Sequence, residues 1–82
     1  MKNAIPIRVK TAVELKPGET GIISRFGEPA LSLKLMEMGC LPGTSIRMLF
    51  SAPFGDPIAY EVAGYRLSLR WDEAIAIFLE TQ

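Results

Sequence analysis

The stretch from Met38 to Ile58, MGCLPGTSIRMLFSAPFGDPI, decides the fold of this 82-residue chain. We expect a helix to end at Gly39, because a residue without a Cβ readily adopts the left-handed conformation found at helix C-termini. Pro42-Gly43 then turns the chain into a strand over residues 44–50, which ends in the Pro-Phe-Gly-Asp-Pro turn at 53–57. Two tight corners around one strand are typical of a small β-barrel and leave no room for a catalytic loop, so this stretch indicates a binding module.

The composition is that of a single globular domain spanning residues 1–82. Apolar residues make up 49% and charged residues 22%, which excludes a disordered tail. Nine basic residues balance nine acidic ones. Without a basic surplus we expect no binding to nucleic acid, and a net charge of zero permits a homo-oligomer. The chain begins without the apolar run of a signal peptide and has no stretch long enough for direct membrane insertion, so we expect a cytoplasmic protein.

The pattern along the chain predicts a mainly β fold, a small closed barrel of five to six strands with one inserted α-helix over about residues 30–38. The expected elements are an edge strand at 5–9, a helical turn at 12–14, a strand at 20–26, the helix, strands at 44–50, 58–62 and 65–70, a polar turn at Asp72-Glu73, and a last strand at 75–79. Ala63-Gly64 is expected to form a two-residue hairpin turn.

The predicted helix is apolar on two sides. Leu31, Leu35 and Met38 share one face, which we expect to pack on the barrel. Leu33 and Met36 lie on a second arc. The helix therefore needs a second partner besides its own barrel.

The residues that usually carry chemistry are scarce. The chain has no histidine, which removes the commonest general base and metal ligand. The single cysteine, Cys40, excludes an internal disulfide and is interpreted as a small buried hydrophobe. Asp72 and Glu73 are adjacent and the other carboxylates are dispersed. All are interpreted as solvated surface charge, with Asp56 bonding its own turn. We therefore expect no metal site, no cofactor and no enzymatic activity.

Two aromatic residues stand outside the alternating pattern. Phe54 lies at the tip of a turn, and Trp71 stands between Arg70 and Asp72. Burial in the core and exposure on the surface are equally weighted for both residues. If they are exposed beside the second helix arc, they would supply the anchors of a protein interface.

Several ordered segments together resemble the FeoA family, small proteins of ferrous iron transport. They are Pro17-Gly18-Glu19 with Gly21-Ile22-Ile23, residues 33–39, Leu41-Pro42-Gly43-Thr44, residues 52–58, and Leu67-Ser68-Leu69-Arg70 followed by Glu73-Ala74. The resemblance covers about three quarters of the chain and implies an SH3-like barrel. It also implies an accessory role to FeoB, a membrane permease with a cytosolic GTPase domain. Iron-dependent repressors carry a related SH3-like domain.

Three functions follow as hypotheses. The first is a module that docks on FeoB, with partner-binding residues Leu33, Lys34, Met36, Glu37, Phe54 and Trp71. Trp71 departs from the commoner family pattern and is expected to alter the choice of partner. The alternative is a regulatory domain that senses ferrous iron or a small ligand directly. A third hypothesis is an activator that supplies an arginine to the GTPase; its candidates are Arg25, Arg47, Arg66 and Arg70.

Overall fold

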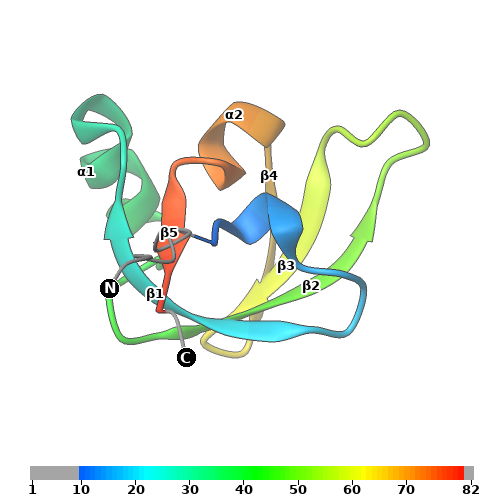
Figure 1. The fold of residues 1–82 in the computed structure, drawn as a ribbon, viewed down its shortest axis with the longest axis horizontal. Coiled ribbons are helices and arrows are strands. Elements are labelled where there is room, and N and C mark those ends of the chain that lie inside the picture. The colour runs from blue at the N-terminus through cyan, green and yellow to red at the C-terminus, as the bar shows by residue number, and fades with distance from the viewer. Residues whose placement is uncertain (1–9, 81–82) are drawn as a thin grey trace, which may run out of the picture.

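The computed structural model describes residues 10–80 and shows the mainly β, SH3-like fold that the sequence predicts (Figure 1). Its elements are the 3-10 turn η1 (Ala12–Glu14), strand β1 (Thr20–Phe26), helix α1 (Pro29–Glu37), strands β2 (Ser45–Ser51), β3 (Ile58–Val62) and β4 (Tyr65–Leu69), the short helix α2 (Trp71–Ala74) and strand β5 (Ile77–Leu79). The edge strand expected at residues 5–9 lies outside the described residues.

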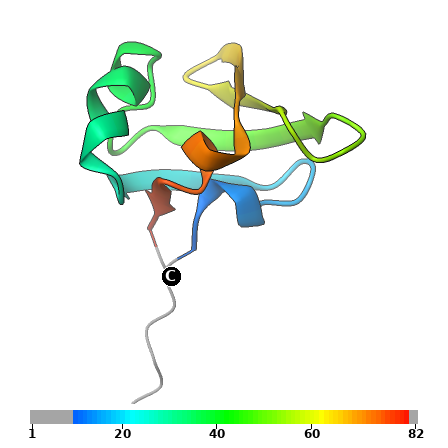
Figure 2. The ribbon, with the colours of Figure 1, turned by 90° about the horizontal axis from the view of Figure 1, so that it is seen from above.

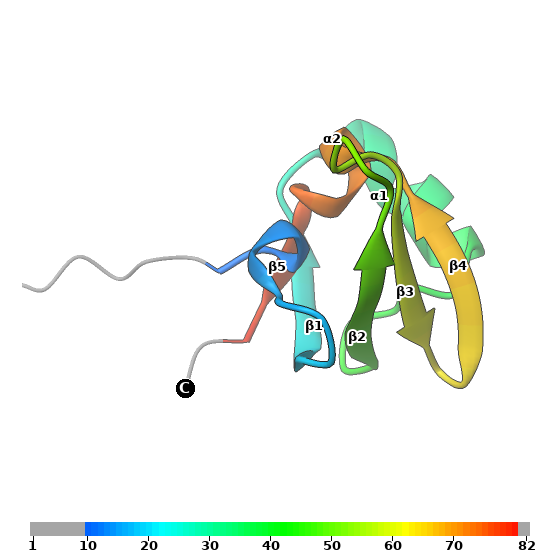
Figure 3. The same cartoon turned by 90° about the vertical axis from the view of Figure 1, so that its right-hand side faces the viewer.

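The five strands form one antiparallel sheet in the order β4-β3-β2-β1-β5. The sheet curls strongly, so that α1 and α2 lie on one side of it (Figures 2 and 3). The predicted SH3-like fold is confirmed, but the sheet is not closed, because among residues 10–80 no strand pairing joins β4 to β5. Helix α2 makes the connection between these two strands instead.

Strand β2 departs from simple alternation. Ile46 and Met48 are buried as expected, but Phe50 is 51% exposed although the alternation places it on the same face. The register shifts between Met48 and Phe50, so Leu49 is an extra residue without a partner in β3. A bulge of this kind turns all later residues to the opposite face.

The hairpin between β3 and β4 confirms the predicted two-residue turn. Val62 pairs with Tyr65 across Ala63-Gly64. Both turn residues have positive φ, +53° for Ala63 and +84° for Gly64. This is a type I′ turn, whose twist matches that of the flanking strands.

Helix α1 begins and ends within one residue of the predicted bounds of about 30–38. Gly39 has φ +101°, and its N–H donates to Met36 O at 3.0 Å. The N–H of Cys40 donates to Leu35 O at 2.9 Å, which completes the paired hydrogen bonds of a Schellman motif. The side chains of Cys40 and Leu35 are both fully buried at this corner.

The inner face of α1 was predicted only in part. Leu35 is in the core and Leu31 packs against it. Met38 is 36% exposed, so its assignment to the packed face is wrong. Met38 is the C-cap residue with αR backbone, and its N–H still donates to Lys34 O at 3.1 Å. Its exposure therefore comes from its place at the end of the helix and not from a change of helical phase.

The core fills the concave side of the sheet. Its largest fully buried side chains are Tyr60, Ile23, Leu35, Ile46, Leu69, Ile77, Val62 and Cys40. The Tyr60 hydroxyl donates to the carbonyl of Ala12 at 2.8 Å. This bond ties η1 to the centre of the core, and burial raises the pKa of Tyr60.

Candidate functional site

A groove lies where the loop between β2 and β3 meets α2 and η1. It has a volume of about 360 Å³ and is lined by Val13, Met48, Ser51, Phe54, Gly55, Asp56, Ile58 and Trp71. Apolar side chains from three separate segments form its walls. An open groove with a mixed apolar and polar lining that includes two aromatic residues is a surface suited to binding another molecule.

Phe54 is presented on a loop with defined geometry. Its side chain is 99% exposed. Gly55 follows with φ +85°, and its N–H donates to Ala52 O at 2.7 Å. Phe54 thus projects from a hydrogen-bonded turn, and such an aromatic ring binds at a low entropic cost.

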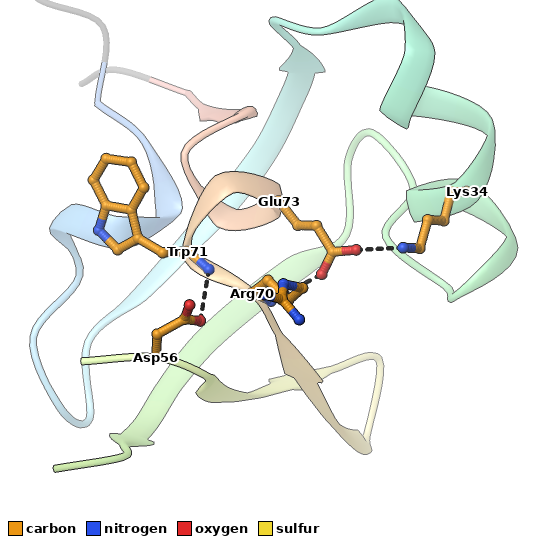
Figure 4. A network of polar contacts seen from close by, with 5 residues as sticks. All are labelled: Lys34, Asp56, Arg70, Trp71 and Glu73. Carbon is orange, nitrogen blue, oxygen red and sulfur yellow. Dashed lines mark hydrogen bonds and ion pairs between the residues drawn. The ribbon is translucent and has the colours of Figure 1, made fainter. Parts of the chain in front are cut away.

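Asp56 fastens this loop to α2. Its Oδ1 accepts the backbone N–H of Trp71 at 2.9 Å (Figure 4). The expectation that Asp56 bonds its own turn is therefore wrong: its partner stands 15 residues further along the chain. The first N–H groups of a helix have no partner within it, and the Asp56 carboxylate satisfies one of them.

Glu73 is the main residue that sequence reasoning missed. It is 5% exposed, so the interpretation of Asp72-Glu73 as a solvated turn is wrong for this carboxylate. Its Oε1 accepts the N–H of Arg70 at 2.8 Å, and its Oε2 forms an ion pair with Lys34 Nζ at 2.7 Å (Figure 4). The spacing of Arg70 and Glu73 could have predicted this contact, because the side chain of a Glu three residues after an N-cap commonly accepts the N-cap N–H.

The same cap explains why a helix replaces the expected turn. With Glu73 bonded to Arg70, residues Trp71–Ala74 form one helical turn. Ile75 becomes its C-cap and is 38% exposed. The last strand therefore starts at Ile77 and not at the predicted residue 75.

The buried carboxylate is ionised more readily than an ordinary one. Hydrogen bonding from Lys34, followed by the backbone bond from Arg70, lowers the pKa of Glu73. The pKa of Cys40 is raised, mainly by burial and further by the negative charge of Glu73. Cys40 is fully buried, which confirms its interpretation as a small hydrophobe.

A second apolar surface lies on and beside α1, which we call the helix surface. Its exposed apolar side chains are Leu33 (64%), Met36 (37%), Met38 (36%) and Leu41 (49%). Glu37 is exposed at the end of the same helix. The Lys34 side chain is 59% exposed, and its ammonium group is bound to Glu73. Lys34 therefore fixes α1 to α2.

The structure does not bring the six predicted partner-binding residues together. Phe54 and Trp71 border the groove, whereas Leu33, Met36 and Glu37 belong to the helix surface. In two perpendicular views α1 and the β2–β3 loop lie at opposite ends of the sheet, with α2 between them (Figures 1 and 2). The chain thus offers two separate surfaces, and the partner-binding role of the six residues stays a prediction.

The four candidate arginines have defined surroundings. Arg25 stacks over the ring of Phe78 at 4.5 Å, and Arg66 lies over Phe50 at 5.0 Å. Arg47 forms an ion pair with Glu61 at 3.0 Å. Arg70 lies beside Glu73 and contributes to the low pKa of that residue. All four are exposed, and the geometry does not single out any one of them as the arginine that a GTPase would receive.

Among residues 10–80, no three His, Cys, Asp or Glu side chains gather in a way that could hold a metal ion. Within the same range, no helix has the length and apolar character needed to cross a membrane.

A family model described as the FeoA domain matches residues 10–81. The chain is 34% identical over 68 residues to a fusion of Fe(2+) transport protein A with the Fe(2+) transporter FeoB from Porphyromonas gingivalis. That alignment covers 82% of this chain and 8% of the fusion protein, so the chain spans a small part of the length of this relative.

Solved structures share the fold. An FeoA-like protein from Clostridium acetobutylicum superposes with a TM-score of 0.81 at 35% identity, over 89% of this chain and 86% of that one. The zinc complex of FeoA from Stenotrophomonas maltophilia, described as a prokaryotic SH3 domain protein, gives a TM-score of 0.75 at 25% identity, over 87% and 89% of the two chains.

Proposed function

The chain belongs to the FeoA family, and we propose that it is a cytoplasmic accessory protein of ferrous iron uptake that docks on a FeoB-type permease. In this proposal it modulates the transport or the GTPase cycle of the permease. The observation that carries the proposal is the fusion relative, in which a homologous segment and a FeoB transporter are parts of one polypeptide. Fusion keeps two domains at a high effective concentration, which is useful when they act on each other.

We assign the docking to the two surfaces described above. The groove contributes Phe54 and Trp71, and the helix surface contributes Leu33 and Met36. Lys34 and Glu37 belong to the polar border of the helix surface in this proposal. Exposed aromatic side chains commonly supply most of the binding energy of an interface. Phe54 is therefore expected to be the strongest single anchor.

The test is calorimetric titration of the chain against its full-length permease in detergent, with and without a non-hydrolysable GTP analogue. We expect Phe54→Ser to weaken binding by roughly 30-fold, the loss of one interface hot spot. Met36→Glu should weaken binding through the helix surface, since it places a charge in an apolar contact. Tyr65→Ser is the matched control, because it removes another exposed aromatic side chain outside both surfaces.

Unchanged affinity in both Phe54→Ser and Met36→Glu, with the fold intact, would refute the assignment of these surfaces. A failure of the wild-type chain to bind the permease in any nucleotide state would refute the docking function. Stoichiometric, submicromolar binding of ferrous iron to the isolated chain would then favour the direct iron sensor. Loss of GTPase stimulation in Arg70→Ala with binding retained would favour the arginine activator.

A further inference from the structure

The outer edge of β4 is open. Strand β4 pairs with β3 on one side, and among residues 10–80 no strand pairs with its other side. Tyr65 is 76% exposed, and Arg66 and Ser68 are exposed as well. An open edge of this kind is a template for another strand.

The hairpin geometry identifies which backbone groups face outward. Val62 and Tyr65 close a two-residue turn and therefore form a hydrogen-bonded pair. Pairing alternates along an antiparallel ladder, so Tyr65, Leu67 and Leu69 bond to β3. The N–H and C=O groups of Arg66 and Ser68 consequently point away from the sheet. Arg66 and Ser68, two residues apart, thus each offer one hydrogen-bond donor and one acceptor at this edge.

We propose that this edge pairs antiparallel with β4 of a second copy of the chain, about a two-fold axis through Leu67. In this register Leu67 stands opposite Leu67 of the second copy, and Arg66 stands opposite Ser68 of the second copy. Both outward pairs then exchange their N–H and C=O groups, which gives four hydrogen bonds. The two sheets join into one continuous sheet.

Charge selects this register from its neighbours. A two-fold axis perpendicular to the sheet keeps each residue on its own face, so the register can change only in steps of two residues. One neighbouring register sets Arg66 against Arg66 of the second copy, and the other sets Arg66 against Arg70 of the second copy. Like charges directly opposite each other destabilise a strand pair. The register centred on Leu67 places no two arginines directly opposite each other.

The side chains on both faces suit this register. On the concave face Tyr65, Leu67 and Leu69 meet the same three residues in reverse order, which gives a continuous apolar row. On the convex face Arg70 lies opposite Gly64 of the second copy, which has no side chain. Arg66 already stands opposite Glu61 of β3, and the zero net charge of the chain gives no long-range repulsion between copies.

The pairing is expected to be weak. A contact between two five-residue strands is smaller than the roughly 1,200 Å² that stable complexes bury. We therefore expect a dissociation constant of about 0.1–1 mM, the range of transient contacts. The dimer should form at high local concentration and be absent from dilute samples.

The first test is sedimentation velocity of the full chain from 10 µM to 1 mM. Ser68→Glu places a carboxylate opposite Arg66 at two symmetric positions, and it should tighten the dimer roughly 2- to 30-fold. Ser68→Lys is the matched control and should leave the chain monomeric over this range. The proposal is overturned by a wild-type chain that stays monomeric at 1 mM, or by equal association of the two variants.

The second test fixes the register by oxidative cross-linking. Leu67→Cys brings two thiols together on the two-fold axis, within reach of a disulfide. Ser68→Cys should not cross-link, because its two copies are displaced along the strands beyond disulfide range. Native Cys40 is fully buried and serves as the background. Faster cross-linking through Ser68→Cys than through Leu67→Cys would overturn the proposed register. This test does not involve the permease, so its outcome is independent of the docking function.

Discussion

Replacing Glu73 by Gln tests the contact that holds α1, α2 and the β4 end together. Gln keeps an oxygen that accepts the N–H of Arg70, but it removes the charge that pairs with Lys34. Lys34 is 59% exposed, so solvent screens the pair and limits its contribution to about 0.5–1 kcal/mol. A hydrogen bond to a charged acceptor stabilises the folded state by about 1 kcal/mol more than a hydrogen bond to a neutral acceptor. The free energy of unfolding at pH 7 should therefore fall by about 1–2 kcal/mol.

The pH dependence gives a sharper readout than the stability at one pH. The pKa of Glu73 is lower in the folded protein than its usual value of 4.5. The unfolded chain therefore binds more protons at acidic pH, and the stability from ionised Glu73 is fully present above the unfolded pKa. This stability is lost as the pH falls below 4.5 through the lower, folded pKa. Glu73→Gln has no such loss, so the difference between wild type and variant should shrink over this window.

The assay is urea unfolding between pH 3 and pH 8, followed by the fluorescence of Trp71, the single tryptophan, on α2. Glu37→Gln is the matched control, because Glu37 is exposed on α1; its effect should stay within about 0.5 kcal/mol. A double-mutant cycle with Lys34→Gln isolates the ion pair. If Glu73→Gln and wild type differ by the same amount at pH 3 and pH 7, the assigned role of the Glu73 charge is wrong.

Three further predictions concern single positions. Gly27→Ala should destabilise the fold by about 1–3 kcal/mol in urea unfolding, because a Cβ there would lie 2.3 Å from Phe78 Cζ. An unchanged free energy of unfolding would show that the Phe78 ring moves aside without cost. Ala63→Asn should raise stability by about 0.5–1 kcal/mol, since Asn tolerates the φ of +53° better than Ala, and a loss of stability would contradict the type I′ assignment. Cys40 should react with a thiol reagent at pH 8 only as fast as the chain unfolds, because it is buried and its pKa is raised; rapid labelling of the folded protein would contradict this.

The elements with strong local signals were predictable. Gly39 marks the end of α1 because only the left-handed conformation allows the paired hydrogen bonds to Leu35 and Met36. Ala63-Gly64 marks the hairpin, and the period-two pattern after it marks β4. In each case residues close in sequence make the decisive interaction, so the pattern contains the information.

The features that failed depend on contacts between distant segments. Leu49 forms a bulge because of the register in which β2 pairs with β3. The alternation of residues within β2 contains no information on this register. Glu73 is buried because Lys34, on another helix, neutralises it. Asp56 bonds Trp71 only because the fold brings the β2–β3 loop beside α2. From the sequence alone, a charged residue in a short polar stretch is predicted to be solvated, because its partner lies far away along the chain.

Helix α2 links both proposed docking surfaces although it has a single turn. The N–H of Trp71 at its N-terminus has no acceptor within the helix and instead donates to Asp56, which positions the loop of Phe54. Two residues later Glu73 binds Lys34 and positions α1. An isolated turn of four residues is not stable by itself in water, so these side-chain bonds are what keep α2 folded. Disruption at Glu73 should therefore loosen the groove as well as the helix surface, and Glu73→Gln should weaken permease binding although Glu73 is buried and outside both surfaces.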